Sequence, residues 1–240
     1  MNGNTWLLIV CLFACLAGIA VCAGNDDAGE DDDTADDVGD DDVTDDDDSA
    51  DDDTTEPIRV ACVGDSITEI SEYPADLQSL LGDGSLVGNF GHSGAVVSER
   101  FSDKTYLYQD EFDEAVAFLP QVVIILLGTN DSDKDIVPYI DEFVGDYTDL
   151  VDAFRSLDSA PIIWPVIPPP IFENTLGRTD TNLVTYVIPE IEEVAASPSL
   201  TTIDLHTPLA GRDDYFSDGL HPNAAGSLAI AEIIYSALVE

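Results

Sequence analysis

The chain has 240 residues, of which 45% are hydrophobic, and this is enough to build one well-buried domain but not two large ones. Its 7 basic and 50 acidic residues give a formal net charge of −43 at pH 7. Because this charge would repel nucleic-acid phosphates, it excludes a nucleic-acid partner, and it also disfavours binding to an anionic membrane surface.

Residues 1–23 have the pattern of a secretory signal peptide. Trp6 to Val21 is an apolar run that is short for a membrane span, and it ends in the small-residue sequence Val21-Cys22-Ala23. We predict cleavage after Ala23 and no membrane span. Acylation of Cys22, which would leave a lipid anchor, is the alternative. In either case we expect the domain outside the cytoplasm, secreted or tethered to the cell surface.

Residues 24–56 form an Asp-rich, low-complexity segment without Lys or Arg. Such a segment cannot bury enough apolar surface to offset the entropy lost on ordering, so we expect a disordered linker that is extended by self-repulsion. A weak Ca²⁺- or mineral-binding tract is the alternative, although the segment lacks the Gly and Glu spacing of an EF-hand loop.

From residue 57 to residue 240, short β-like runs alternate with helical patterns. Predicted strands cover residues 58–63, 86–90, 122–127, 162–167 and 201–205, and predicted helices cover residues 74–81, 111–119, 137–157, 183–196 and 223–239. The uninterrupted apolar run 122–127 is typical of a central parallel strand that is buried on both faces. The pattern therefore predicts a single α/β domain with three layers, in which helices cover both faces of a five-stranded parallel sheet.

In such a sheet, ligands bind outside the carboxyl ends of the strands. Segments with reactive residues follow the first three predicted strands (64–68, 91–94 and 128–131), and a fourth (218–222) precedes the last helix. Ester hydrolysis needs a nucleophile, a base, a group that orients the base, and donors for the oxyanion. The candidates for these roles, in the same order, are Ser66, His221, Asp218, and the pair Gly94 and Asn130.

Taken singly, each segment also has a purely structural interpretation. A turn explains Gly64-Asp65-Ser66, an Asx-type cap explains Asn130, a helix-capping carboxylate explains Asp218, and a positive φ explains Gly94. The occurrence of all four segments in order, next to the predicted strand ends and the last helix, favours the catalytic interpretation.

This combination resembles the SGNH (GDSL-type) hydrolase family, over residues 58–240. The resemblance implies that Ser66 attacks the acyl carbonyl and that His221, held by Asp218, acts as base and then as acid. It also implies an oxyanion hole made of the Ser66 N–H, the Gly94 N–H and the Asn130 amide, with no metal or organic cofactor. Segments 64–69, 89–91 and 127–132 are most similar to the sialate O-acetylesterase and carbohydrate acetylesterase branch.

Other candidates for chemistry are few. His92, which lies between Gly91 and Gly94, is expected to satisfy a local hydrogen bond or to line the substrate pocket. His206 has no upstream acid at a useful spacing, and Cys62 lies in an apolar run where a lone Cys is most often a small core residue.

We therefore predict a secreted serine esterase that removes short acyl groups, chiefly acetyl, from carbohydrates, so that its partner is a small-molecule or saccharide ester. The negative charge of the domain favours neutral saccharides, and it also predicts that stability rises in molar NaCl. Two alternatives stay open: a lysophospholipase- or thioesterase-type hydrolase of lipid esters, and a non-catalytic acidic surface or cation-binding protein.

Overall fold

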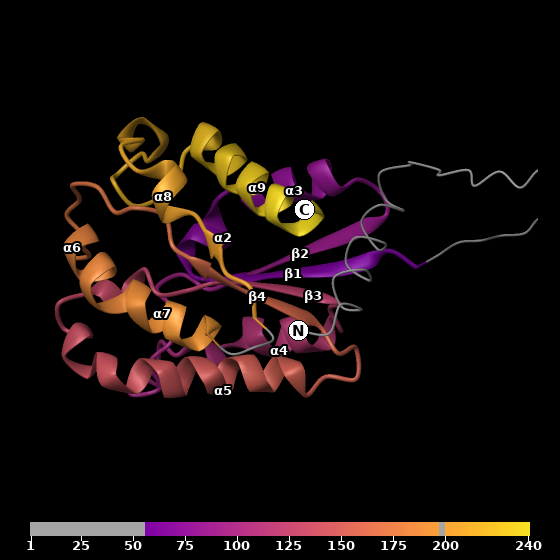
Figure 1. Cartoon of the computed structure of the whole chain (residues 1–240), viewed down its shortest axis with the longest axis horizontal. Coiled ribbons are helices and arrows are strands. Elements are labelled where there is room, and N and C mark those ends of the chain that lie inside the picture. Colours follow the sequence, from indigo (N-terminus) through magenta and orange to yellow (C-terminus); the bar gives the residue numbers. More distant parts are fainter. Residues whose placement is uncertain (1–55, 197–199) are drawn as a thin grey trace, which may run out of the picture.

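The computed structural model describes residues 56–196 and 200–240 (Figure 1). The predicted signal peptide (1–23) and the predicted linker (24–56), apart from its last residue, lie outside the described residues. Within the described part of the chain, no helix has both the length and the apolar character needed to cross a membrane.

A five-stranded parallel sheet forms the centre of the domain. Its strands are β1 (Ile58–Gly64), β2 (Ser85–Gly91), β3 (Val122–Leu126), β4 (Ile162–Ile167) and β5 (Ile203–Asp204), in the spatial order β2-β1-β3-β4-β5. β3 lies in the middle and is buried along its whole length, as its continuous apolar sequence predicts. The predicted α/β fold with five parallel strands is confirmed.

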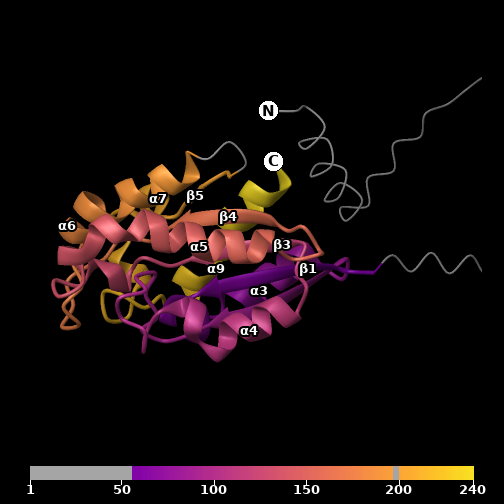
Figure 2. The ribbon, with the colours of Figure 1, turned by 90° about the horizontal axis from the view of Figure 1, so that it is seen from below.

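Helices cover both faces of the sheet and make three layers (Figures 1 and 2). One face carries α3 (Tyr73–Leu81) and α9 (Ala224–Val239), and the other carries α4 (Asp110–Ala117), α5 (Phe143–Arg155) and α7 (Ile188–Ala195). Successive side chains of a strand point to opposite faces. In β1, Val60 and Cys62 therefore belong to the core under α3 and α9, whereas Ala61 and Val63 belong to the core under α4, α5 and α7.

Two helices predicted as continuous are interrupted. Residues 137–157 begin as the 3₁₀-helix η3 (Val137–Glu142) before α5, and η3 buries no side chain that would hold it to α geometry. Residues 183–196 are preceded by α6 (Asp180–Asn182) and start with a π-helical turn, η4 (Leu183–Val187), before α7. Pro189, the second residue of α7, has no N–H for an intrahelical hydrogen bond and accounts for the irregular spacing before it.

The sequence pattern misses several short helices. These are α2 (Ser66–Ile70), α8 (His206–Leu209), and the 3₁₀ turns η1 (Tyr106–Tyr108), η2 (Asn130–Ser132) and η5 (Asp213–Tyr215). β5 is also shorter than the predicted strand 201–205 at both ends. At its carboxyl end, Asp204 accepts the N–H groups of His206 and Thr207 at 2.8 and 3.0 Å and thereby starts α8. Side-chain caps of this kind leave no periodic signal in the sequence.

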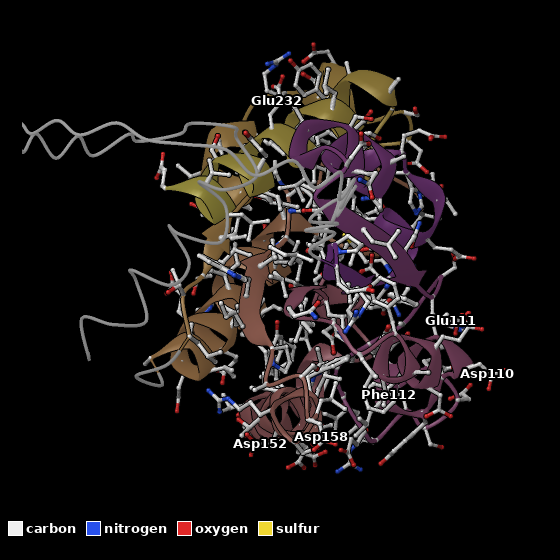
Figure 3. The ribbon with its side chains drawn as sticks, turned by 90° about the vertical axis from the view of Figure 1, so that its right-hand side faces the viewer. Asp110, Glu111, Phe112, Asp152, Asp158 and Glu232 are labelled. Atoms are coloured by element: carbon white, nitrogen blue, oxygen red, sulfur yellow. The ribbon has the colours of Figure 1, made fainter. Side chains whose placement is uncertain are left out.

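Acidic side chains gather on the outer faces of the helices and on the turn that follows α5. Figure 3 shows Asp110, Asp152, Asp158 and Glu232 at the rim of the molecule, and all four are exposed. Phe112, by contrast, packs against the core, with its ring centroid 5.4 Å from that of Phe154. The charge on these helices thus lies in the solvent.

Candidate active site

Ser66 lies where β1 gives way to a helix. The completely buried Asp65 caps α2, because its Oδ1 accepts the N–H of Ile67 at 2.9 Å, and Ser66 is the first residue of that helix. The turn needs a glycine just before it, since a Cβ atom on Gly64 would overlap the side chain of Thr68. The local sequence therefore places the Ser66 hydroxyl at the carboxyl edge of the sheet.

Two successive hydrogen bonds link Ser66 to a carboxylate. Ser66 Oγ lies 2.9 Å from His221 Nε2, and His221 Nδ1 lies 2.7 Å from Asp218 Oδ2. Asp218 Oδ1 accepts the backbone N–H groups of Leu220 and His221 at 3.0 and 2.8 Å.

The electrostatics of Asp218 favour one tautomer of His221. Partial burial on its own would raise the pKa of Asp218, but the hydrogen bonds from His221 and from the Leu220 amide lower it to about 2. Asp218 is consequently ionised at neutral pH and favours a proton on His221 Nδ1. Nε2 is then free to accept the proton of Ser66.

Gly94 and Asn130 follow β2 and β3, the two strands that flank β1. Gly94 has φ of +81°, and no atom lies within 4 Å of the place that a Cβ atom would occupy. Asn130 is 3% exposed, and its Nδ2 donates to Ala95 O at 2.9 Å and to Asp65 Oδ2 at 3.3 Å. An oxyanion would compete with these acceptors for the amide, and the longer bond, to Asp65, is the easier one to exchange.

A cavity of about 320 Å³ lies over Ser66. It is lined by Ser66, Ile70, Ser93, Gly94, Asn130, Leu176, Arg178, Leu220 and His221. Four of the five residues predicted from the sequence therefore share one cavity, and the fifth, Asp218, is hydrogen-bonded to His221. A nucleophile, an oriented base and two candidate oxyanion donors around one cavity form an arrangement suited to acyl transfer.

The sequence profile of the GDSL-like Lipase/Acylhydrolase family matches residues 62–229. The chain belongs to this family. An acetylxylan esterase of Xylanibacter ruminicola (strain ATCC 19189 / DSM 19721 / CIP 105475 / JCM 8958 / 23) is 35% identical to this chain in an alignment 209 residues long, which covers 76% of the chain and 43% of that esterase. The GDSL esterase/lipase WDL1 of Oryza sativa subsp. japonica is 25% identical in an alignment 141 residues long, which covers 50% of the chain and 54% of WDL1. The chain thus spans about half the length of these curated relatives.

Solved structures share the fold of this chain. The acetyl xylan esterase AlAXEase superposes with a TM-score of 0.61 at 21% identity, over 75% of this chain and 99% of AlAXEase. A carbohydrate acetylesterase family member from Sinorhizobium meliloti superposes with a TM-score of 0.57 at 18% identity, over 76% of this chain and 99% of the other. The family resemblance drawn from the sequence motifs is confirmed, and an acetylxylan esterase is among the relatives of the chain.

Two buried carboxylates support the candidate site, and sequence reasoning assigned them no role. Asp65 and Asp131 have no exposed surface. Burial raises the pKa of Asp65 to about 6 and that of Asp131 to about 7, although backbone hydrogen bonds to each carboxylate act in the opposite direction. Asp131 Oδ1 accepts the N–H groups of Val97 and Ser98 at 3.1 and 3.3 Å. It thereby holds the segment that follows Gly94.

Arg178 is a further cavity residue that sequence reasoning missed. It lies between β4 and α6, and its side chain is 22% exposed. Nη1 donates to Leu176 O at 2.7 Å, and Nε lies 3.9 Å from Asp133 Oδ2. The surrounding sequence has no motif, so the only signal was that Arg178 is one of 7 basic residues in a strongly acidic chain.

The remaining histidines and Cys62 have partners or positions elsewhere. His92 Nδ1 lies 2.9 Å from Glu111 Oε2, the local hydrogen bond expected of it. His206 has no upstream acid at a useful spacing in the sequence, but folding brings Asp180, 26 positions upstream, to 3.0 Å from its Nε2 through Oδ1. Burial raises the pKa of the Cys62 thiol to about 12, which fits a core residue. Among residues 56–196 and 200–240, no group of three or more His, Cys, Asp or Glu side chains is placed to hold a metal ion.

Proposed function

We propose that this acylhydrolase removes short acyl groups, chiefly acetyl, from carbohydrates by a serine mechanism. The observation that carries the proposal is the hydrogen-bonded chain from Ser66 through His221 to Asp218, on the wall of a cavity that Gly94 and Asn130 also line. The 35% identity to an acetylxylan esterase supports the choice of an acetyl ester of a sugar.

In the first half of the proposed reaction, Ser66 Oγ attacks the carbonyl carbon of the ester while its proton passes to His221 Nε2. The carbonyl oxygen becomes an oxyanion, which the backbone N–H groups of Ser66 and Gly94 and the amide of Asn130 would stabilise. When the tetrahedral intermediate collapses, the bond to the sugar oxygen breaks. The proton on His221 goes to that oxygen, and an acyl ester of Ser66 remains.

In the second half, water replaces the sugar. His221 Nε2 takes a proton from the water molecule, whose oxygen attacks the acyl carbon, and the same oxyanion donors act again. Collapse of this intermediate returns the proton to Ser66 Oγ and releases the carboxylic acid. The ionised Asp218 stabilises the imidazolium in both halves, since its hydrogen bond to Nδ1 is charge-assisted when His221 is protonated.

The dimensions and walls of the cavity support a short acyl group. Its volume of about 320 Å³ lies at the small end of the range of about 300–1,000 Å³ for ligand sites. Ile70, Leu176 and Leu220 give it an apolar wall, whereas Arg178 and Ser93 give it polar groups for an alcohol with hydroxyls.

We also propose that the enzyme acts outside the cytoplasm. The support is the apolar run of residues 6–21 and the small-residue sequence that ends at Ala23. Residues 24–56 would then serve as a tether or spacer, with or without a lipid on Cys22.

Hydrolysis of p-nitrophenyl esters from acetate to laurate tests the proposed function, in low and in molar NaCl, with Ser66→Ala and His221→Ala beside the parent. We expect the highest kcat/KM on acetate, a steep fall by octanoate, and a loss of at least about 1,000-fold in either variant. An optimum on octanoate or laurate would favour a lipid ester instead. Activity that survives in Ser66→Ala would contradict the serine mechanism.

A further inference from the structure

A second, smaller hollow opens beside the cavity over Ser66. It measures about 130 Å³ and shares two wall residues, Gly94 and Arg178, with the main cavity. Its other walls are Val96, Phe101, Lys104, Asp133, Asp135 and Ile136. Because the two hollows meet at Gly94 and Arg178, a ligand whose ester group lies at Ser66 can extend into the smaller one.

The two cationic side chains of this hollow, Arg178 and Lys104, have few partners among the described residues. Arg178 Nε is buried and has no hydrogen-bond acceptor within the described residues, since the nearest carboxylate oxygen, of Asp133, is 3.9 Å away. Lys104 is exposed and takes part in none of the ion pairs found among residues 56–196 and 200–240. Buried donors without an acceptor are rare in folded proteins and call for an explanation, and a bound ligand is one.

The remaining walls select the chemistry of that ligand. Phe101 supplies the accessible apolar surface, since Val96 and Ile136 are buried, and the ring of Phe101 is held edge-on to that of Tyr139 with 5.8 Å between the centroids. Two cations, Lys104 and Arg178, stand beside two carboxylates, so the formal charge of the walls is zero. A sugar ring fits this combination, because it has apolar faces, carries hydroxyls that both donate and accept hydrogen bonds, and has no charge.

We propose that this hollow is a subsite for a neutral sugar unit next to the unit that carries the ester, so that the preferred substrate is a saccharide chain. The inference rests on the proposed function and names the substrate class more narrowly. Arg178 stands at the junction of the two hollows and would donate to an oxygen atom between the two sugar units. Phe101 would face the ring of the second unit, and Lys104 and Asp133 would meet its hydroxyls.

The test compares three substrates: p-nitrophenyl acetate, an acetylated methyl xyloside with one sugar unit, and acetylated xylo-oligosaccharides. The variants are Phe101→Ala and Lys104→Gln. Tyr108→Ala, which truncates an exposed aromatic ring, and Arg155→Gln, which removes one positive charge from the end of α5, are the matched controls. The readout is the ratio of kcat/KM for the oligosaccharide to kcat/KM for the single unit.

We expect the parent enzyme to prefer the oligosaccharide, and we expect each of the two variants to lower the ratio by about five- to tenfold, the usual effect of losing one good contact. The controls should leave the ratio within about twofold. Equal kcat/KM values on the single unit and on the oligosaccharide would overturn the subsite, and so would controls that lower the ratio as much as the variants do. In either case, hydrolysis of p-nitrophenyl acetate that depends on Ser66 would leave the proposed function intact. If that hydrolysis does not depend on Ser66, the proposed function fails and the subsite fails with it. Lys104 is exposed, so Lys104→Gln decides the matter if Phe101→Ala does not fold.

Discussion

Asp131→Asn should make the folded domain less sensitive to pH. The carboxylate is fully buried, and burial raises its pKa from 3.8 to about 7. Between about pH 4 and pH 7 the folded state therefore binds more protons than the unfolded chain. For a raised pKa, the stabilisation is fully present below the unfolded pKa and is lost as the pH rises through the folded pKa.

The size of this effect follows from the shift. An increase of about 3 in the pKa of Asp131 corresponds to a loss of about 4 kcal/mol of unfolding free energy when the carboxylate is fully ionised. About 2 kcal/mol of this loss occurs between about pH 5 and pH 7. Burial also raises the pKa of Asp65, to about 6, and the charge of Asp65 is one of the causes that raise the pKa of Asp131. The two titrations are coupled and act in the same direction, so the parent domain should lose at least about 2 kcal/mol of unfolding free energy over this interval, apart from the general repulsion among its surface acids.

Urea unfolding at a series of pH values between about 5 and 7 measures the effect. Asn at position 131 keeps one oxygen to accept the N–H groups of Val97 and Ser98, which both contact Oδ1 in the parent. Asp158→Asn removes the same charge from an exposed position and serves as the control for surface repulsion. We expect Asp131→Asn to lose about 2 kcal/mol of the pH dependence. Equal slopes for Asp131→Asn and Asp158→Asn would refute the assignment of the effect to the buried carboxylate.

Three further substitutions address the site. Asp218→Asn should lower kcat by about 1,000- to 10,000-fold with little change in folding, because the neutral amide no longer favours a proton on His221 Nδ1. Since the pKa of Asp218 is about 2, protonation of this carboxylate should limit the activity of the parent only below about pH 3. Asn130→Ala should lower kcat by about 100- to 1,000-fold with little change in KM, and a change in KM alone would argue against an oxyanion donor. Gly64→Ala should lower the unfolding free energy by about 2 kcal/mol in urea, because the added methyl group overlaps the Thr68 side chain, and an unchanged midpoint would show that the turn tolerates a Cβ atom.

Much of the fold could be predicted because the signals were local. The apolar run of β3 is buried on both faces and needs no partner to be recognised, and Asn223 caps α9 with its own side chain, which accepts the N–H groups of Ala225 and Gly226. The reactive segments could be located for the same reason, since parallel strands end at one edge of the sheet. Ser66, Gly94, Asn130 and His221 come together there from four separate segments.

Features that depend on contacts between distant segments could not be predicted. The chain between β4 and α6 has no periodicity in its sequence. The isolated antiparallel β-bridge between Asp133 and Arg178, which brings the arginine to the cavity, therefore becomes visible only in the folded structure. The burial of Asp131 depends on its contact with residues 97 and 98, more than thirty positions away. The hydrogen bond between His206 and Asp180 likewise joins residues that are distant in the sequence.

Covalent trapping tests the central claim, that Ser66 is the nucleophile, most directly. The enzyme is treated with an alkyl fluorophosphonate, and peptide mass mapping then locates the adduct while residual hydrolysis of p-nitrophenyl acetate is followed in parallel. We expect a single adduct on the peptide that contains Ser66, loss of activity in proportion to its formation, and no labelling of Ser66→Ala. An adduct on another residue that abolishes activity, or full activity in a protein completely labelled at Ser66, would contradict the account.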